Sequence, residues 1–129
     1  MTTPPDSTGT PPIEDEGEGR IALRLDDLAS MGRLVAGIVG KGEDAYLDEG
    51  IDGQILRAAG RAQIVDIATV AEKLPAEFKD RYPDVEWVKI QRMRNLIAHH
   101  YDKVIDDFVW ETLRTRIPEL IAVLGLTGR

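Results

Sequence analysis

The spacing of apolar residues limits the possible folds of this chain more than any other feature. From Arg20 to Leu124, apolar side chains recur at steps of three and four residues, which places them along one face of a helix. Pro and Gly residues interrupt the pattern in a few places, and no useful stretch shows the two-residue alternation of a strand. The sequence therefore predicts an all-α fold, an up-and-down bundle of four to five helices.

The interruptions divide the periodic region into four main helices. Pro75 ends the second of them, and the third ends close to Ala98. Two shorter helical turns are expected at 44–49 and 76–80. The four main helices are expected at residues 20–39, 52–74, 84–98 and 108–124.

The last helix has a marked start and an interruption. Asp106 and Asp107 precede its apolar run, at the place where an N-cap residue is expected. Pro118 lies inside it and should kink or divide it near 114–117, because proline lacks the N–H that a helix interior needs. The large aromatic residues Trp87, Phe108 and Trp110 are expected in the core.

The first 19 residues differ in composition from the rest. They contain five acidic residues, four Pro and no Lys or Arg, so they carry −5 of the net charge of −7 and leave −2 for residues 20–129. Few apolar side chains are present to offset the entropy of ordering. We expect a disordered acidic tail at 1–19 and a helical domain at 20–129. The tail is either a solvated leader or an anion-like segment that competes for a basic site.

Composition excludes several classes of protein. There is no Cys, and therefore no disulfide, thiolate metal site or thiol redox chemistry. No apolar run reaches the ~18–20 residues that a membrane-spanning helix needs, and residues 1–20 lack a signal-peptide pattern. We expect a soluble cytoplasmic protein that does not contact a membrane.

Three residues near the end of the third helix carry side chains that can bind a phosphate or take part in a reaction. Arg94 is followed by His99 and then by Tyr101. A guanidinium can hold a phosphate through two hydrogen bonds, and an imidazole, with a typical pKa of ~6.5, can move a proton at neutral pH. The adjacent His99 and His100 point to different sides of a helix and have no His partner one turn away, so no metal site is expected.

A straight helix does not bring Arg94 and His99 together. Five residues rotate by about 500°, which leaves the two side chains about 140° apart, whereas Tyr101 stacks almost over Arg94. Three solutions remain open. The helix distorts near 98–100, the long Arg94 side chain extends around it, or two copies of the chain share one site.

The pattern R-x4-H-x-Y formed by Arg94, His99 and Tyr101 resembles the signature of the HEPN superfamily, and in particular of its HepT-like (DUF86-type) members. The likeness continues through residues 78–120. The first half of the chain is similar only in helix layout, and residues 1–19 lie outside it. The resemblance implies a homodimer in which helices of two protomers line one cleft. It also implies a metal-independent endoribonuclease, the toxin of a toxin–antitoxin system.

The resemblance also implies a role for each residue of the motif. His99 would take the proton from a ribose 2′-OH or give one to the leaving 5′-oxygen, while Arg94 would hold the phosphate. Asn95 and His100 would support them, His100 as a side chain that flanks the catalytic histidine. The RNA products would end in a 2′,3′-cyclic phosphate and a 5′-hydroxyl.

Tyr101 is implied to be the target of the antitoxin. In HepT-like systems a separate nucleotidyltransferase of the MNT type transfers AMP to the matching Tyr. The partner consumes the ATP, so this chain would need no cofactor of its own. AMP on Tyr101 would add bulk and negative charge beside Arg94 and His99, and would block RNA.

Two other functions remain open. The chain could be a non-catalytic HEPN module that binds and positions a nucleotidyltransferase partner or a nucleotide, or a structural helical dimer without a ligand. Each motif residue also has a plain structural explanation. Arg94 could pair with Asp102 or Asp106, His99 could stabilise the end of a helix through the macrodipole, and Tyr101 could be a buried capping residue.

Overall fold

The computed structural model describes residues 13–99 and 103–129, and this part of the chain contains helices and no strands. The long helices are α2 (Ile13–Val39), α4 (Ile51–Lys73) and α6 (Trp87–His99). A final helical segment consists of α7 (Lys103–Glu111), the wider helical turn η1 (Thr112–Arg116) and α8 (Ile117–Val123). The short helices are α3 (Glu43–Tyr46) and α5 (Ala76–Asp80). The prediction of an all-α fold is confirmed for these residues.

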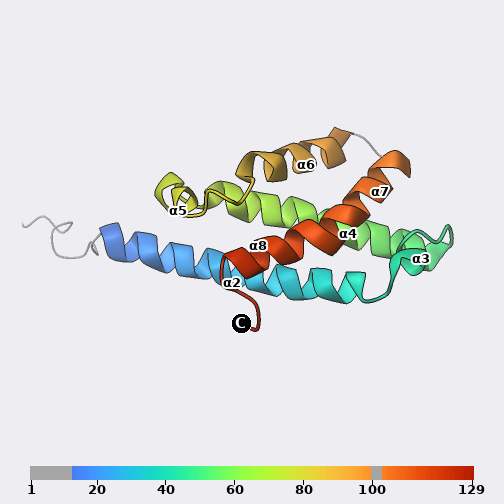
Figure 1. The fold of residues 1–129 in the computed structure, drawn as a ribbon, viewed down its shortest axis with the longest axis horizontal. Coiled ribbons are helices and arrows are strands. Elements are labelled where there is room, and N and C mark those ends of the chain that lie inside the picture. Colours follow the sequence, from blue (N-terminus) through green and yellow to red (C-terminus); the bar gives the residue numbers. More distant parts are fainter. Residues whose placement is uncertain (1–12, 100–102) are drawn as a thin grey trace, which may run out of the picture.

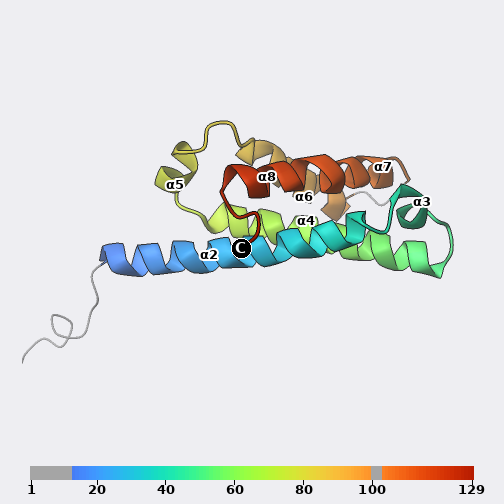
Figure 2. The ribbon, with the colours of Figure 1, turned by 60° about the horizontal axis from the view of Figure 1, so that its bottom comes forward.

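Helix α4 lies at the centre of the arrangement. It packs against α2, α6 and α7, while η1 and α8 pack against α2. Successive long helices run in alternating directions, and α6 and the α7–α8 segment both lie above the layer formed by α2 and α4 (Figures 1 and 2). The core between them consists of apolar side chains with 2% or less of their surface exposed, among them Leu28, Val35, Ile64, Ile67, Val109 and Leu113.

Two helices begin at other residues than the apolar pattern indicates. Helix α2 begins at Ile13 rather than near Arg20. Helix α6 begins at Trp87 rather than Asp84 because a turn precedes it, in which the N–H of Val85 donates to the carbonyl of Tyr82.

The proline predictions are confirmed. Helix α4 ends at Lys73, two residues before Pro75, and the final segment is interrupted at the expected place before Pro118. In a regular helix the ring of Pro118 would clash with the carbonyl of Arg114. The wide turn η1, Thr112–Arg116, relieves this clash, and Pro118 then lies in the first turn of α8, where no N–H is required.

Two predictions about the last helix are wrong. Asp106 is not an N-cap, because α7 begins three residues earlier at Lys103, and the Asp106 side chain is buried inside the first turn. Phe108 is not in the core and is 58% exposed. The buried face of α7 instead consists of Ile105, Val109 and Trp110, and Phe108 is not part of it. Of the other aromatics, Trp110 is buried and Trp87 is partly buried.

Of the two glycines of α4, Gly53 and Gly60, Gly60 is the one to which another side chain comes closer. A Cβ atom added there would lie 2.7 Å from Leu113 Cδ1 and 2.7 Å from the Tyr46 hydroxyl oxygen. Both neighbours are fully buried and cannot move aside easily. We expect Gly60→Ala to lower the free energy of unfolding by about 1–3 kcal/mol, as measured by chemical denaturation.

The matched control for this prediction is Gly37→Ala on α2, where an added Cβ would meet nothing within 4 Å. It should raise stability by roughly 0.5–1 kcal/mol, because alanine is the better helix former. A Gly60→Ala protein as stable as the Gly37→Ala protein would show that the α4 packing is looser than described.

Candidate functional site

Helix α6 carries Arg94, Asn95 and His99, and its packing on α4 determines which of them face solvent. Ile97 is buried against the core, and Gln91 Nε2 donates to the carbonyl oxygen of Ala68 on α4 at 2.8 Å. Asn95 and His99 lie on the other side and are exposed. They are one helical turn apart and therefore share a face. His99 is the last residue of α6.

Arg94 points toward α4. Its Nη2 atom lies 3.4 Å from Oε2 of Glu72, and the two side chains are 28% and 58% exposed. Among the described residues the partner of Arg94 is thus Glu72 and not Asp106, which pairs elsewhere, and Asp102 lies outside the described residues. An ion pair this exposed is worth only ~0–1 kcal/mol. Arg94 can therefore exchange the Glu72 carboxylate for another anion at little cost.

The structure does not bring Arg94 and His99 into contact within one chain. No hydrogen bond joins them among the residues that the structure describes, and α6 stays helical as far as His99. The separation of about 140° expected from helix geometry therefore holds for this part of the helix. His100 and Tyr101 lie outside the described residues, so their roles stay predictions.

A buried ionic cluster is the feature that the sequence pattern did not reveal. Asp106, which is 7% exposed, forms an ion pair with Arg61 Nη2, and its second oxygen lies 3.8 Å from Arg57 Nε. Arg57 also donates to the carbonyl oxygens of Tyr46 at 2.9 Å and Asp48 at 2.6 Å. The available signal was the pair Arg57 and Arg61, one turn apart on a helix otherwise rich in small and apolar residues.

Tyr46 completes this buried region. Its ring is fully buried and lies 5.0 Å from the ring of Trp110, measured between centroids. Its hydroxyl has no hydrogen-bond partner among the described residues. Burial, and then the nearby Asp106 carboxylate, raise the pKa of Tyr46 to about 12.

Replacement of Tyr46 tests this environment. Between pH 10 and about 12 the unfolded chain loses the Tyr46 proton while the folded chain keeps it, so the free energy of unfolding should fall as the pH rises through this window. At pH 11.5 Tyr46→Phe should remove roughly 2 kcal/mol of that loss. At neutral pH it should be neutral or stabilising by up to ~1 kcal/mol, because the hydroxyl is unpaired. Denaturation curves at pH 7, 10 and 11.5 measure both effects.

Tyr82→Phe is the control, because the Tyr82 side chain is only partly buried. It should leave the alkaline loss of stability as in wild type. An equal loss of stability in Tyr46→Phe and wild type between pH 10 and 11.5 would contradict the buried position of the Tyr46 hydroxyl.

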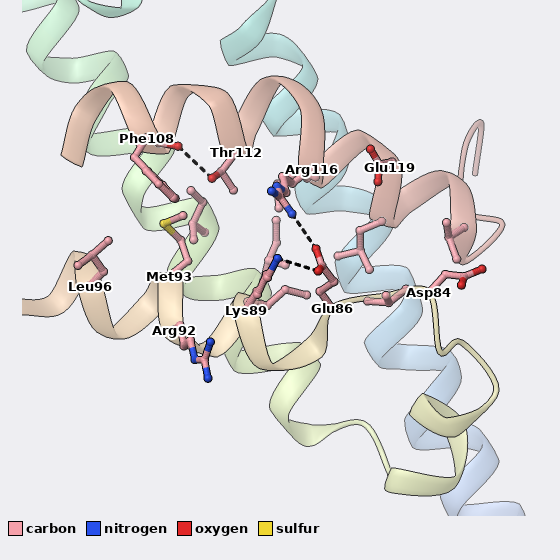
Figure 3. Close-up of a pocket in the computed structure, with 17 residues that line it drawn as sticks. Asp84, Glu86, Lys89, Arg92, Met93, Leu96, Phe108, Thr112, Arg116 and Glu119 are labelled. Atoms are coloured by element: carbon pink, nitrogen blue, oxygen red, sulfur yellow. Dashed lines mark hydrogen bonds and ion pairs between the residues drawn. The ribbon is translucent and has the colours of Figure 1, made fainter. Parts of the chain in front are cut away.

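A groove lies between α6 and the α7–α8 segment, with α4 as its floor. It encloses about 390 Å³ and is lined mainly by apolar side chains such as Ile67, Met93 and Phe108 (Figure 3). Glu86 bridges one end through contacts of 2.8 Å to Lys89 and 2.8 Å to Arg116. The hydrogen bond from Lys89 is the main reason why the pKa of Glu86 lies below its usual range. Arg94, Asn95 and His99 are not among the lining residues.

Two further observations concern the described part of the chain alone. It contains no group of three or more His, Asp or Glu side chains arranged to hold a metal ion. None of its helices combines the length and the apolar character needed to cross a bilayer.

Comparison with known proteins decides the family. The family described as "Ribonuclease HepT-like" matches residues 46–125, which include α4 through α8 and only the last residue of α3. The chain belongs to the HepT-like ribonuclease family. The family prediction made from the motif is thus confirmed. The match begins at Tyr46, so it includes α4, in the part of the chain where the sequence likeness was least apparent, and leaves α2 outside.

Several proteins are similar to this HepT-like chain. "Putative RNase TTE0752" of Caldanaerobacter subterraneus subsp. tengcongensis is 37% identical over 54 residues, which are 42% of this chain and 48% of that protein. "Putative RNase MJ0127" of Methanocaldococcus jannaschii is 25% identical over 75 residues, 58% of this chain and 62% of that protein. "Probable ribonuclease HepT" of Thermococcus cleftensis is 28% identical over 78 residues, 60% of this chain and 66% of that protein.

The HepT-like chain therefore spans about half to two thirds of the length of these curated relatives. No solved structure matches it.

Proposed function

We propose that this chain is a metal-independent endoribonuclease, the toxin of a toxin–antitoxin system, and that Arg94 and His99 are its catalytic residues. The family match over residues 46–125 carries the proposal, together with the names of the relatives, which refer to ribonucleases. The exposed position of His99 at the end of α6 supports it, because a group that moves protons on RNA must be accessible to RNA.

The proposed reaction is an internal transesterification of RNA. His99 takes the proton from a 2′-OH or delivers one to the leaving 5′-oxygen, and water makes the other of these two proton transfers. The 2′-oxygen attacks the adjacent phosphorus as the P–O5′ bond breaks. Arg94 gives up Glu72 and holds the phosphate, whose charge grows in the transition state. Asn95, on the same face as His99, is a second polar contact. The products are a 2′,3′-cyclic phosphate and a 5′-hydroxyl.

We further propose that two copies of the chain share the site. One α6 helix directs Arg94 and His99 about 140° apart, so a phosphate held by Arg94 of one copy is more easily reached by His99 of another. Mixing an inactive Arg94→Ala chain with an inactive His99→Ala chain tests this directly. Recovery of cleavage in the mixture supports a shared site, and a dimer without any recovery contradicts it.

Neutralisation is proposed to occur by AMP transfer to Tyr101 from an MNT-type nucleotidyltransferase antitoxin. Expression of the chain alone should arrest growth, and co-expression of the cognate nucleotidyltransferase should restore it. Mass spectrometry of the co-expressed protein should find AMP on Tyr101. Growth that is restored equally for Tyr101→Phe would contradict this route, because phenylalanine has no hydroxyl to modify.

Glu72 should compete with RNA for Arg94. We expect Glu72→Gln to lower the KM for RNA by up to about fivefold, because an exposed ion pair of at most ~1 kcal/mol no longer has to be broken. Steady-state kinetics measure this, with Glu77→Gln on α5 as the control for a general loss of negative charge. A higher KM for Glu72→Gln would show that Glu72 orients Arg94 for the substrate instead of competing with it.

A further inference from the structure

The buried cluster of Asp106, Arg57 and Arg61 (the Asp106 cluster) has a structure that stability does not require. A buried carboxylate loses its hydration, and the attraction of its cation often only offsets that loss. Apolar side chains of similar size would fill the same space at equal or lower cost. What an ion pair adds is direction, because the guanidinium and the carboxylate must meet in one geometry. The helices that the cluster joins are therefore the elements whose relative position it fixes.

The cluster ties three helices together at one end of the molecule. Asp106 belongs to the first turn of α7, and Arg57 and Arg61 belong to α4. Arg57 also donates to the carbonyl oxygens of Tyr46 and Asp48, at the end of α3. The end of α6 and the start of α7 lie at this same end of the bundle (Figure 1). The start of α7 is thereby fixed on α4.

His99 is linked to this fixed point through a short length of chain. It is the last residue of α6, and only residues 100–102 separate it from Lys103, the first residue of α7. A displacement of α7 along α4 therefore moves Lys103, to which His99 is joined by only three residues. The His99 side chain itself is exposed, and no hydrogen bond from the described residues fixes its orientation.

We propose that Arg61 and Asp106 are positioning residues, which hold the imidazole of His99 where the cleavage reaction needs it. They act through the start of α7 and do not contact RNA. The proposal rests on the function proposed above for His99. A misplacement of a catalytic group by about 1 Å can lower the rate up to ~10²-fold. An ion pair that fixes the start of α7 can therefore have a large effect on the rate of cleavage.

The decisive variant is Arg61→Met/Asp106→Leu, which replaces the ion pair by two apolar side chains and leaves Arg57 with its carbonyl partners. Because an apolar pair replaces the ion pair, the fold should unfold at the wild-type denaturant midpoint or above it. We expect its kcat to fall by roughly tenfold or more while KM changes less than about twofold. Arg61→Lys keeps the charge but loses the planar fork, and should lie between this variant and wild type.

A second measurement does not depend on activity. The chain has two histidines, so the ring Cε1–H resonance of His99 can be assigned in NMR spectra by means of His100→Gln. We expect this resonance to shift in Arg61→Met/Asp106→Leu. It should stay in place in the control Arg114→Gln, which removes an exposed ion pair between Arg114 on η1 and Glu111 at the end of α7.

The outcomes separate this proposal from the proposed function. Wild-type kcat together with an unshifted His99 resonance in the folded double variant would overturn the positioning role and leave the ribonuclease intact. Absence of cleavage by wild type would count against the ribonuclease. The His99 resonance would then decide positioning by itself, with a shift in the double variant supporting it and no shift overturning it.

Discussion

Replacement of His99 by alanine is expected to lower the rate of RNA cleavage by about 10²- to 10⁴-fold, the usual contribution of a general acid or base. The fold should not change, because His99 is exposed at the last position of α6 and makes no contact with the core. The loss should appear in kcat more than in KM, since proton transfer is a feature of the transition state. Single-turnover cleavage of a defined RNA measures it.

His100→Ala is the matched control, because it removes the same side chain one residue later. It should retain most of the activity if His99 is the catalytic histidine. A reversed result, with His100→Ala inactive and His99→Ala active, would move the catalytic role by one residue. Equal activity of both variants and wild type would contradict histidine catalysis at this motif.

Replacement of Arg94 by alanine is expected to lower kcat/KM by about 10²- to 10³-fold, as the loss of one charged group that stabilises the transition state usually does. The loss of its exposed contact with Glu72 should cost at most ~1 kcal/mol of stability. The kcat/KM of Arg94→Lys should lie between those of wild type and Arg94→Ala, since lysine keeps the charge but cannot contact the phosphate through two parallel hydrogen bonds. Kinetics over a range of RNA concentrations separate KM from kcat.

Arg20→Ala on α2 is the control for a general loss of positive charge, because Arg20 is exposed and lies outside the motif. A loss of activity as large as that of Arg94→Ala would mean that overall charge, rather than a contact of Arg94 with the phosphate, governs RNA cleavage. If Arg94→Ala had the kcat and KM of wild type, Arg94 would have no role in the reaction.

The architecture could be predicted from the sequence because its determinants are local. Apolar residues at helical spacing indicate which segments are helices, and Pro75 and Pro118 alter the backbone wherever they occur. The single turn at Ala76–Asp80 was also predictable, since Pro75 is a favoured start for a helical turn. These features depend on neighbours along the chain and on nothing more distant.

The errors occur where contacts between helices decide the outcome. Asp106 has the local pattern of an N-cap, and only the two arginines of α4, 45 or more residues away, make its burial inside α7 possible. Phe108 is apolar enough for the core, but the rotation of α7 on α4 places Val109 there instead. The sequence shows the periodicity of a helix more clearly than its rotation about its own axis.

The sequence identified the residues of the candidate site better than it identified their contacts. The motif of Arg94, His99 and Tyr101 indicated the family, which the comparison confirms. The contact between Arg94 and Glu72 spans 22 residues and depends on how α6 crosses α4, so the pattern named other carboxylates as partners. The positions of His100 and Tyr101 in relation to Arg94 remain predictions from the motif.

Cleavage of total RNA by the purified protein in EDTA, with wild type beside His99→Ala, tests the central claim most directly. We predict that wild type produces fragments with 2′,3′-cyclic phosphate and 5′-hydroxyl ends and that His99→Ala produces none. Equal cleavage by both proteins would contradict the role of His99. Cleavage by neither, with Tyr101 shown by mass spectrometry to be unmodified, would contradict the ribonuclease and favour a helical module that binds its partner without catalysis.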